Sequence, residues 1–289
     1  MKKALLIGIN YINSNVRLYG CIGDVVNMNT VLTNTFLYDD VKILRDDINT
    51  TTNKPTRNNI LTSLRELVAS SANCSEIWIH YSGHGARIRD LNGDEVSGQD
   101  SVIVPVDFAT AGFIVDDDLY AIIRNSKCRT IILMDSCNSG TVIDLPWSFN
   151  YINPLKYNVS VNNKYALSNP EIYMFSGCKD NQTSADTYSV VLNQAVGAFT
   201  DSFLTCLKNA NYQISLLLLY RNVCRLLQQN GFTQIPVYSS SVSNPMTKSA
   251  IFALPPKPIV STLSTVVTKA NTNTPTKINN TSTKMAMIL

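Results

Sequence analysis

The fold can be inferred first from two stretches, E-I-W-I-H-Y-S-G-H-G at residues 76–85 and R-T-I-I-L-M-D-S-C-N-S-G at residues 129–140. Each begins as an apolar run of the length of a buried strand and ends in small residues. Apolar runs of this kind are typical of strands that are covered on both faces, as in parallel sheets. Ligands bind such sheets beyond the carboxyl ends of the strands, which is where both small-residue segments fall.

Outward from these stretches, strands and helices alternate along the chain. Helical spacing of apolar residues predicts helices between the apolar runs, and Asp24 is suited to cap the first of them. The alternation predicts an α/β fold with a mostly parallel sheet of roughly six to eight strands flanked by helices. The strands are expected at residues 3–9, 41–44, 76–81, 129–135, 171–176 and 248–254, and the helices at residues 24–37, 56–69, 198–207 and 215–228.

Two regions lack such a pattern. Residues 144–170 are rich in Asn, Pro and Tyr and are expected to be irregular, and residues 255–289 are predicted to be a disordered tail. We therefore expect one domain over residues 1–254. The tail contains four lysines and no Asp, Glu or Arg, so the net charge of +3 becomes −1 for residues 1–254. A body with this charge gives no indication of nucleic-acid binding.

The composition excludes several other classes of protein. A hydrophobic content of 45% is too high for a mainly disordered chain. No apolar run approaches the ~18 residues of a membrane span, and the N-terminus lacks the cleavage site of a secretory signal. Without an export signal, the seven cysteines are expected to be reduced thiols. We therefore expect a cytoplasmic protein.

The two stretches also hold the residues suited to catalysis. The only histidines of the chain, His80 and His84, lie in the first, and Cys137 lies in the second. A thiol within reach of an imidazole can be deprotonated and can attack a carbonyl carbon. Neighbouring parallel strands would bring His84 and Cys137 together. Taken alone, each has a simpler interpretation, because a cysteine after an apolar strand is more often a buried packing residue.

A zinc site is the other chemistry open to the two histidines, since histidines four residues apart can hold zinc on a helix. Here they straddle a strand end and Ser82-Gly83, and no third or fourth ligand is evident. Zinc is therefore the weaker interpretation. His80 continues the strand pattern and is expected to pack or to form hydrogen bonds rather than to catalyse.

These motifs resemble those of the metacaspases, a family of caspase-like cysteine peptidases. The resemblance covers residues 3–254 and implies a caspase-like αβα sandwich. It also implies that His84 is the catalytic histidine and Cys137 the nucleophile, with main-chain N–H groups of Gly85 and Cys137 forming an oxyanion hole. The further motifs that carry it are Y-G-C-I-G-D at 19–24, I-V-P-V-D-F at 103–108, I-V-D-D-D-L-Y at 114–120 and F-S-G-C-K-D-N-Q-T-S-A-D at 175–186.

Asp135 stands two residues before Cys137, so the two side chains share one face at the strand end. Its carboxylate has two possible roles: it could orient the histidine, or it could line the pocket for the substrate residue before the cut bond. The resemblance favours the pocket, together with Cys21, Asp24 and Ser82. Two carboxylates in one pocket select a cationic side chain, which predicts cleavage after Arg or Lys.

Residues 90–118 are unusually acidic. An EF-hand loop at 90–95 is excluded, because Glu95 stands where that loop needs glycine. The resemblance instead implies a calcium site of four aspartates, whose oxygens suit this cation. The alternative is a solvated acidic loop in which residues 116–118 begin the next helix. The four positions are Asp100, Asp116, Asp117 and Asp144.

The chain departs from the family pattern at several positions. Asn138 stands where His is usual, Gly23 where Asn is common, and Ala86 where Gln is usual. These changes affect loop shape and substrate contacts rather than the catalytic pair. Because the first strand is expected from residue 3, an N-terminal pro-region is not expected. Lys156 and Lys164 are candidates for self-cleavage or ordinary surface lysines.

The sequence therefore predicts a calcium-activated cysteine endopeptidase that cleaves proteins or peptides after Arg or Lys. We expect a monomer that uses Ca²⁺ and has no nucleic-acid or membrane partner. The alternative is a catalytically weak or inactive caspase-like module that serves in binding or as a scaffold. The presence of both His84 and Cys137 argues against this alternative.

Overall fold

The computed structural model describes residues 1–89, 98–136, 143, 145–153, 156–162, 167–177, 186–189, 194–244 and 251–254. The chain divides into two units, Met1–Pro255 and Pro256–Leu289, and every described residue lies in the first. Cys137 and Asp144 lie outside the described residues, as does the predicted tail.

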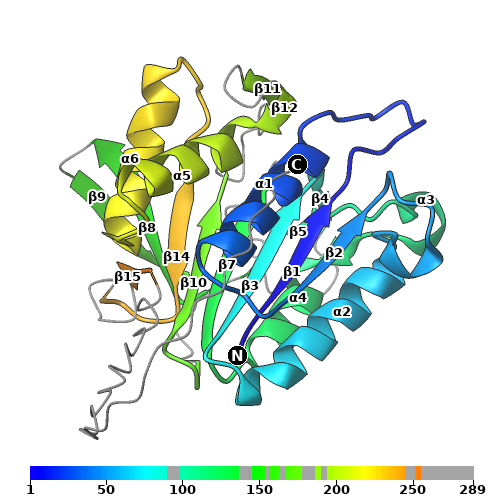
Figure 1. Ribbon diagram of the computed structural model, residues 1–289, viewed down its shortest axis with the longest axis horizontal. Coiled ribbons are helices and arrows are strands. Elements are labelled where there is room, and N and C mark those ends of the chain that lie inside the picture. Colours follow the sequence, from blue (N-terminus) through cyan, green and yellow to red (C-terminus); the bar gives the residue numbers. More distant parts are fainter. Residues whose placement is uncertain are drawn as a thin grey trace, which may run out of the picture. The chain divides into compact units, whose positions relative to one another are not determined.

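Within these residues the principal sheet has eight strands and forms the middle layer of the fold (Figure 1). The first five strands across the sheet run parallel, and the remaining three are joined by antiparallel pairing. This arrangement confirms the predicted α/β fold and its mostly parallel sheet. The order is β2 (Asp40–Arg45), β1 (Lys2–Gly8), β3 (Glu76–Ser82), β7 (Arg129–Asp135), β10 (Ile172–Ser176), β14 (Val237–Ser240), β8 (Trp147–Asn153) and β9 (Lys156–Val161).

Helices cover both faces of this sheet (Figure 1). One apolar core lies under α1 (Cys21–Asn34), α5 (Ala198–Asn209) and α6 (Leu216–Gln229), and the other lies under α2 (Arg57–Ser70) and α4 (Asp116–Ile123). Short helical turns complete the connections at η1 (Thr51–Asn53), η2 (Ser71–Asn73) and α3 (Phe108–Ala111).

Alternation along the central strands determines which side chains face which core. In β1, Leu6 lies in the core under α1 and α5, whereas Leu5 lies in the core under α2 and α4. In β3, Trp78 lies in the core under α1 and α5, and Ile79 lies in the core under α2 and α4. Because side chains alternate along a strand, His80 faces the same side as Trp78.

Smaller sheets adjoin the ends of the principal strands. Directly after the histidine motif, β4 (Gly85–Arg89), β5 (Gln99–Ile103) and β6 (Ile114–Val115) form an antiparallel sheet. Two further ladders join β11 (Asp186–Ser189) to β12 (Gln194–Gly197) and β13 (Ile214–Ser215) to β15 (Ile251–Phe252).

Two features of the C-terminal half differ from the expectation. Residues 144–170, expected to be irregular, contain the hairpin of β8 and β9. The strand expected at 248–254 is the short β15, which pairs with β13, while β14 joins the principal sheet. The apolar pattern of β8 and β14 is weak because both bury serines. Ser148 and Ser239 satisfy each other through a hydroxyl contact of 3.1 Å.

Asp24 is not the cap of the first helix. The helix α1 begins at Cys21 with Gly20 as its N-cap, so Asp24 lies inside the first turn. Its carboxylate is consequently available for contacts outside its own helix.

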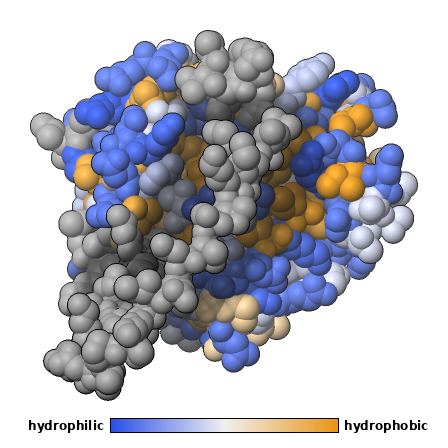
Figure 2. Space-filling model, in the orientation of Figure 1, coloured by the Kyte–Doolittle hydropathy of each residue, from blue (hydrophilic) through white to orange (hydrophobic). Residues whose placement is uncertain are grey.

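None of the helices in the described ranges has the length and apolarity that crossing a membrane requires. On the face shown in Figure 2, hydrophilic residues predominate and hydrophobic side chains appear in separate areas between them.

Candidate active site

Three of the predicted pocket residues meet at the carboxyl ends of β3 and β7. Ser82 and Asp135, the last residues of these strands, are paired in register. Asp24 reaches them from α1, and its Oδ2 accepts a hydrogen bond of 2.7 Å from Ser82 Oγ. All three side chains are buried, with Asp24 at 0% exposure and Asp135 at 4%. The structure thus brings two buried carboxylates to one end of the sheet.

The N-terminus of α5 supplies hydrogen-bond donors to both carboxylates. The backbone N–H of Gly197, the N-cap of this helix, donates to Asp24 Oδ1 at 2.8 Å. Thr200, in the first turn, donates to Asp135 Oδ2 through its backbone N–H at 3.0 Å and its hydroxyl at 2.7 Å. Helix N-termini favour negative charge, so this contact stabilises the ionised form of the pair.

Gly197 passes unusually close to the two acids. A Cβ at this position would lie 2.3 Å from Asp135 Oδ2 and 2.7 Å from Asp24 Oδ2. Such distances are far below van der Waals contact, so only glycine allows the backbone to approach both carboxylates here.

Cys21, the fourth predicted pocket residue, begins α1 and is 3% exposed. The helix starts against the end of β1, where a Cβ on Gly8 would lie 2.6 Å from the carbonyl oxygen of Cys21. Because Gly8 pairs with Ser82, this contact fixes Cys21 beside the strand that carries the pocket.

His84 follows β3 and is partly exposed. Two tyrosines hold its backbone: its N–H donates to Tyr11 Oη at 2.9 Å, and its carbonyl accepts from Tyr81 Oη at 2.7 Å. The Tyr11 ring also packs against the imidazole, with 4.6 Å between ring centroids. The loop that carries His84 is therefore fixed by the core under α2 and α4.

The imidazole of His84 has a defined tautomer. Its Nε2 lies 2.7 Å from the carbonyl oxygen of Val16. A carbonyl oxygen can only accept, so Nε2 carries the proton and Nδ1 is the basic nitrogen. Sequence reasoning did not identify Val16, because a main-chain carbonyl imposes no residue type.

The strand that precedes His84 lies beside the strand that precedes Cys137. The strands β3 and β7 are neighbours, and the N–H of Gly83 donates to the carbonyl of Asp135 at 3.2 Å. Cys137 comes two residues after Asp135, outside the described residues. Gly85 begins β4 opposite Ile103, and its role in an oxyanion hole stays a prediction.

His80 does not have the surroundings of a catalytic base. It is fully buried, and burial lowers its pKa from 6.5 to about 3, so the ring is neutral at pH 7. Its Nε2 lies 3.5 Å from Thr200 Oγ1, and its Nδ1 has no hydrogen-bond partner among the described residues. The packing and hydrogen-bonding role predicted for His80 agrees with these contacts.

The predicted calcium ligands are only partly described. Asp100 and Asp116 are buried, at 8% and 3% exposure, whereas Asp117 is exposed. The Asp116 carboxylate accepts from the N–H groups of Ser101 at 2.8 Å and Asp117 at 3.0 Å. Residues 116–118 form the first turn of α4, as the alternative interpretation required. In the part of the chain that the structure describes, no group of three or more His, Cys, Asp or Glu side chains is arranged to hold a metal ion.

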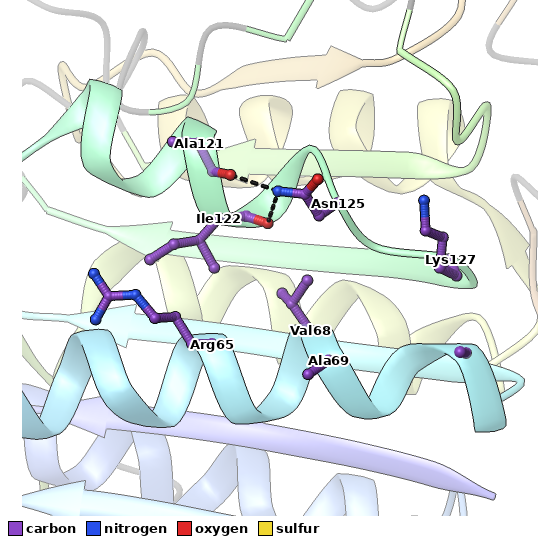
Figure 3. Close-up of a pocket in the computed structure, with 8 residues that line it drawn as sticks. Arg65, Val68, Ala69, Ala121, Ile122, Asn125 and Lys127 are labelled. Carbon is purple, nitrogen blue, oxygen red and sulfur yellow. Dashed lines mark hydrogen bonds between the residues drawn. The ribbon is translucent and has the colours of Figure 1, made fainter.

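A separate groove of about 460 Å³ lies between α2 and α4, on the face opposite α1 and α5 (Figure 3). Its apolar floor includes Val68 and Ile122, and Arg65 and Lys127 lie at its two ends (Figure 3). None of its lining residues belongs to the predicted site, so we do not assign it to substrate.

The mostly parallel sheet, His84 at the end of β3 and the buried pair of Asp24 and Asp135 are the features expected of the caspase-like cysteine peptidases. Comparison with known proteins agrees. A family model described as "Metacaspase, peptidase C14 domain" matches residues 2–146. Metacaspase-1 of Meyerozyma guilliermondii is 36% identical over 288 residues, covering 83% of this chain and 69% of that protein. Metacaspase-1 of Ajellomyces capsulatus is 36% identical over 269 residues, covering 77% and 75%.

Solved structures confirm the fold. Caspase-1 from Spodoptera frugiperda superposes with a TM-score of 0.51 at 12% identity, over 84% of this chain and 87% of that one. A protein from Geobacter sulfurreducens gives a TM-score of 0.54 at 23% identity, over 78% and 88%. The chain belongs to the metacaspase family and is a cysteine-type peptidase.

Proposed function

We propose that this chain is a calcium-activated endopeptidase that cleaves protein substrates after Arg or Lys through His84 and Cys137. The observation that carries the specificity is the pair of buried carboxylates, Asp24 and Asp135, at the end of the strands that lead to His84 and Cys137. Charge-assisted hydrogen bonds to two carboxylates favour a guanidinium or an ammonium and exclude an acidic side chain.

The tautomer of His84 supports its role as the general base. With the proton of Nε2 donated to Val16, Nδ1 can take the proton of the Cys137 thiol. The thiolate then attacks the substrate carbonyl carbon, and His84 returns the proton to the leaving amine as the peptide bond breaks. A water molecule, deprotonated by His84, attacks the thioester, releases the carboxylate product and regenerates the thiol.

Calcium fits the predicted ligands by donor type. Asp100 and Asp116 supply buried carboxylate oxygens, which this cation prefers, and Asp144 would complete the set from the segment after Cys137. Bound there, calcium would neutralise these charges and connect β5 and the start of α4 with that segment. We therefore propose that the cation acts on loop order rather than on the reacting atoms.

The test compares peptide reporters that end in Arg, Lys or Asp, with calcium and with a chelator, in the wild type and in Cys137→Ala. We expect turnover of the Arg and Lys reporters only, its loss in Cys137→Ala, and a large decrease in the chelator. The variant Asp116→Asn should keep the cleavage specificity but lose most of the response to calcium. Equal turnover in the chelator would contradict calcium activation, and cleavage after Asp would contradict the proposed pocket.

A binding or scaffold module is the alternative, and the same assay addresses it. Absence of any turnover that depends on Cys137 would favour that alternative.

A further inference from the structure

A chain of hydrogen bonds connects a buried histidine with the pocket carboxylate of Asp135. The hydroxyl of Thr200 donates to Asp135 Oδ2 at 2.7 Å, so its oxygen remains available as an acceptor. His80 Nε2 lies 3.5 Å from this oxygen. Because the hydroxyl proton is engaged with Asp135, the imidazole is the donor in this contact, and the neutral ring carries its proton on Nε2.

The backbone strengthens the same connection. The N–H of Thr200 donates to Asp135 Oδ2 at 3.0 Å, so one oxygen of the carboxylate accepts twice from one residue. Thr200 is itself 1% exposed and lies in the first turn of α5, whose N-cap Gly197 holds Asp24. The orientation of Asp135 is thus linked to the start of a helix that packs in the core.

We propose that Thr200, supported by His80, is a positioning residue that fixes the Asp135 carboxylate in the orientation that receives a cationic substrate side chain. The inference rests on the proposed specificity for Arg or Lys. A carboxylate already held in place loses little freedom when substrate binds, whereas a mobile carboxylate must be ordered by the substrate itself. The effect is therefore expected in substrate binding rather than in the chemical steps.

The principal test is Thr200→Val, which keeps the shape of the side chain and the backbone N–H but removes the hydroxyl. We expect KM for an Arg reporter to rise about tenfold, the scale of one hydrogen bond to a charged group, with kcat changed less than about twofold. Thr200→Ser keeps the hydroxyl and should retain the wild-type KM. His80→Phe should raise KM by a smaller factor, about threefold, because its contact is longer.

Thr130→Val is a matched control. Thr130 is also a buried threonine, but it lies in β7, the strand that ends in Asp135, and its hydroxyl donates to the carbonyl of Cys128 at 2.9 Å near the opposite end of that strand. Its removal should leave KM unchanged. Circular dichroism verifies that each variant is folded, and if Thr200→Val is not, His80→Phe becomes the deciding variant.

The outcomes separate the two proposals. If the wild type cleaves basic reporters but KM is unchanged in the deciding variant, this inference is overturned and the proposed function is not affected. An equal rise of KM in Thr130→Val also overturns this inference alone. Absence of cleavage that depends on Cys137 in the wild type removes the proposed function and this inference together. A rise in KM confined to Thr200→Val and His80→Phe, and reversed by Thr200→Ser, supports it.

Discussion

At Gly197, the N-cap of α5, the backbone lies close to both Asp24 and Asp135, and a methyl group there has no space. Gly197→Ala would place a Cβ 2.3 Å from Asp135 Oδ2, so the carboxylate or the helix start must move. We expect kcat/KM for Arg and Lys reporters to fall about 100-fold, since displacements near 1 Å at a site have effects of that size. Steady-state kinetics on the purified variant measures this.

The control is Gly231→Ala. Gly231 follows the end of α6, has φ +82°, and a Cβ built on it would have nothing within 4 Å. This change should cost about 1 kcal/mol of unfolding free energy, because alanine is strained at positive φ, and should leave kcat/KM unchanged. Equal activity losses in both variants would show that Gly197 acts through stability alone.

At the scale of single residues, the sequence predicted which side chains lie together but not the groups that form hydrogen bonds with them. Asp24, Ser82 and Asp135 were predicted and lie together. The carbonyl of Val16 and the N–H of Gly197 were not predicted, because any residue provides a main-chain group. Thr200 was expected only as part of a helix, and its contact with Asp135 depends on tertiary structure.

Among the elements, α6 depends on a cap that can be tested separately from the site. Ser215 is its N-cap, and the side chain accepts a hydrogen bond from the N–H of Leu218 at 3.3 Å. Ser215→Ala leaves that N–H without its capping acceptor, so we expect a loss of about 1 kcal/mol of unfolding free energy in urea denaturation. Ser215→Asp should retain most of the stability. If the unfolding free energy of Ser215→Ala is unchanged, packing of α6 and not its cap stabilises the N-terminus of this helix.

Elements with strong patterns were predicted well, and elements stabilised by polar contacts were not. The strand predicted at 129–135 is β7, and the helix predicted at 56–69 is α2 within one residue at each end. The strands β8 and β14 were missed because buried serines interrupt their apolar pattern. Hydrophobic alternation cannot reveal a polar pair whose hydrogen bond forms only after the strands associate.

For the whole molecule, burial of His80 makes stability depend on pH. Its folded pKa of about 3 lies below the unfolded value of about 6.5, so the unfolded state binds the proton first as the pH falls. Stability is therefore complete above pH 6.5 and is lost progressively towards pH 3. Between pH 7 and pH 4.5 this residue should account for about 3 kcal/mol of lost unfolding free energy.

Urea titrations of the wild type and His80→Phe at both pH values test this expectation. The variant cannot bind that proton, so its unfolding free energy should decrease by about 3 kcal/mol less than that of the wild type. Because each protein is compared with itself at the two pH values, the effect of the substitution on packing cancels. Equal decreases in both proteins would contradict the assignment of the acid sensitivity to His80.

The hydrogen bond from Gly197 to Asp24 spans 173 residues of sequence. A growing polypeptide therefore contains His84 and Cys137 long before it contains the amides that hold Asp24 and Asp135. A chain that ends before α5 would contain His84 and Cys137 without the hydrogen bonds that hold Asp24 and Asp135. The proposed selection of Arg or Lys therefore requires α5 to have been synthesised and packed.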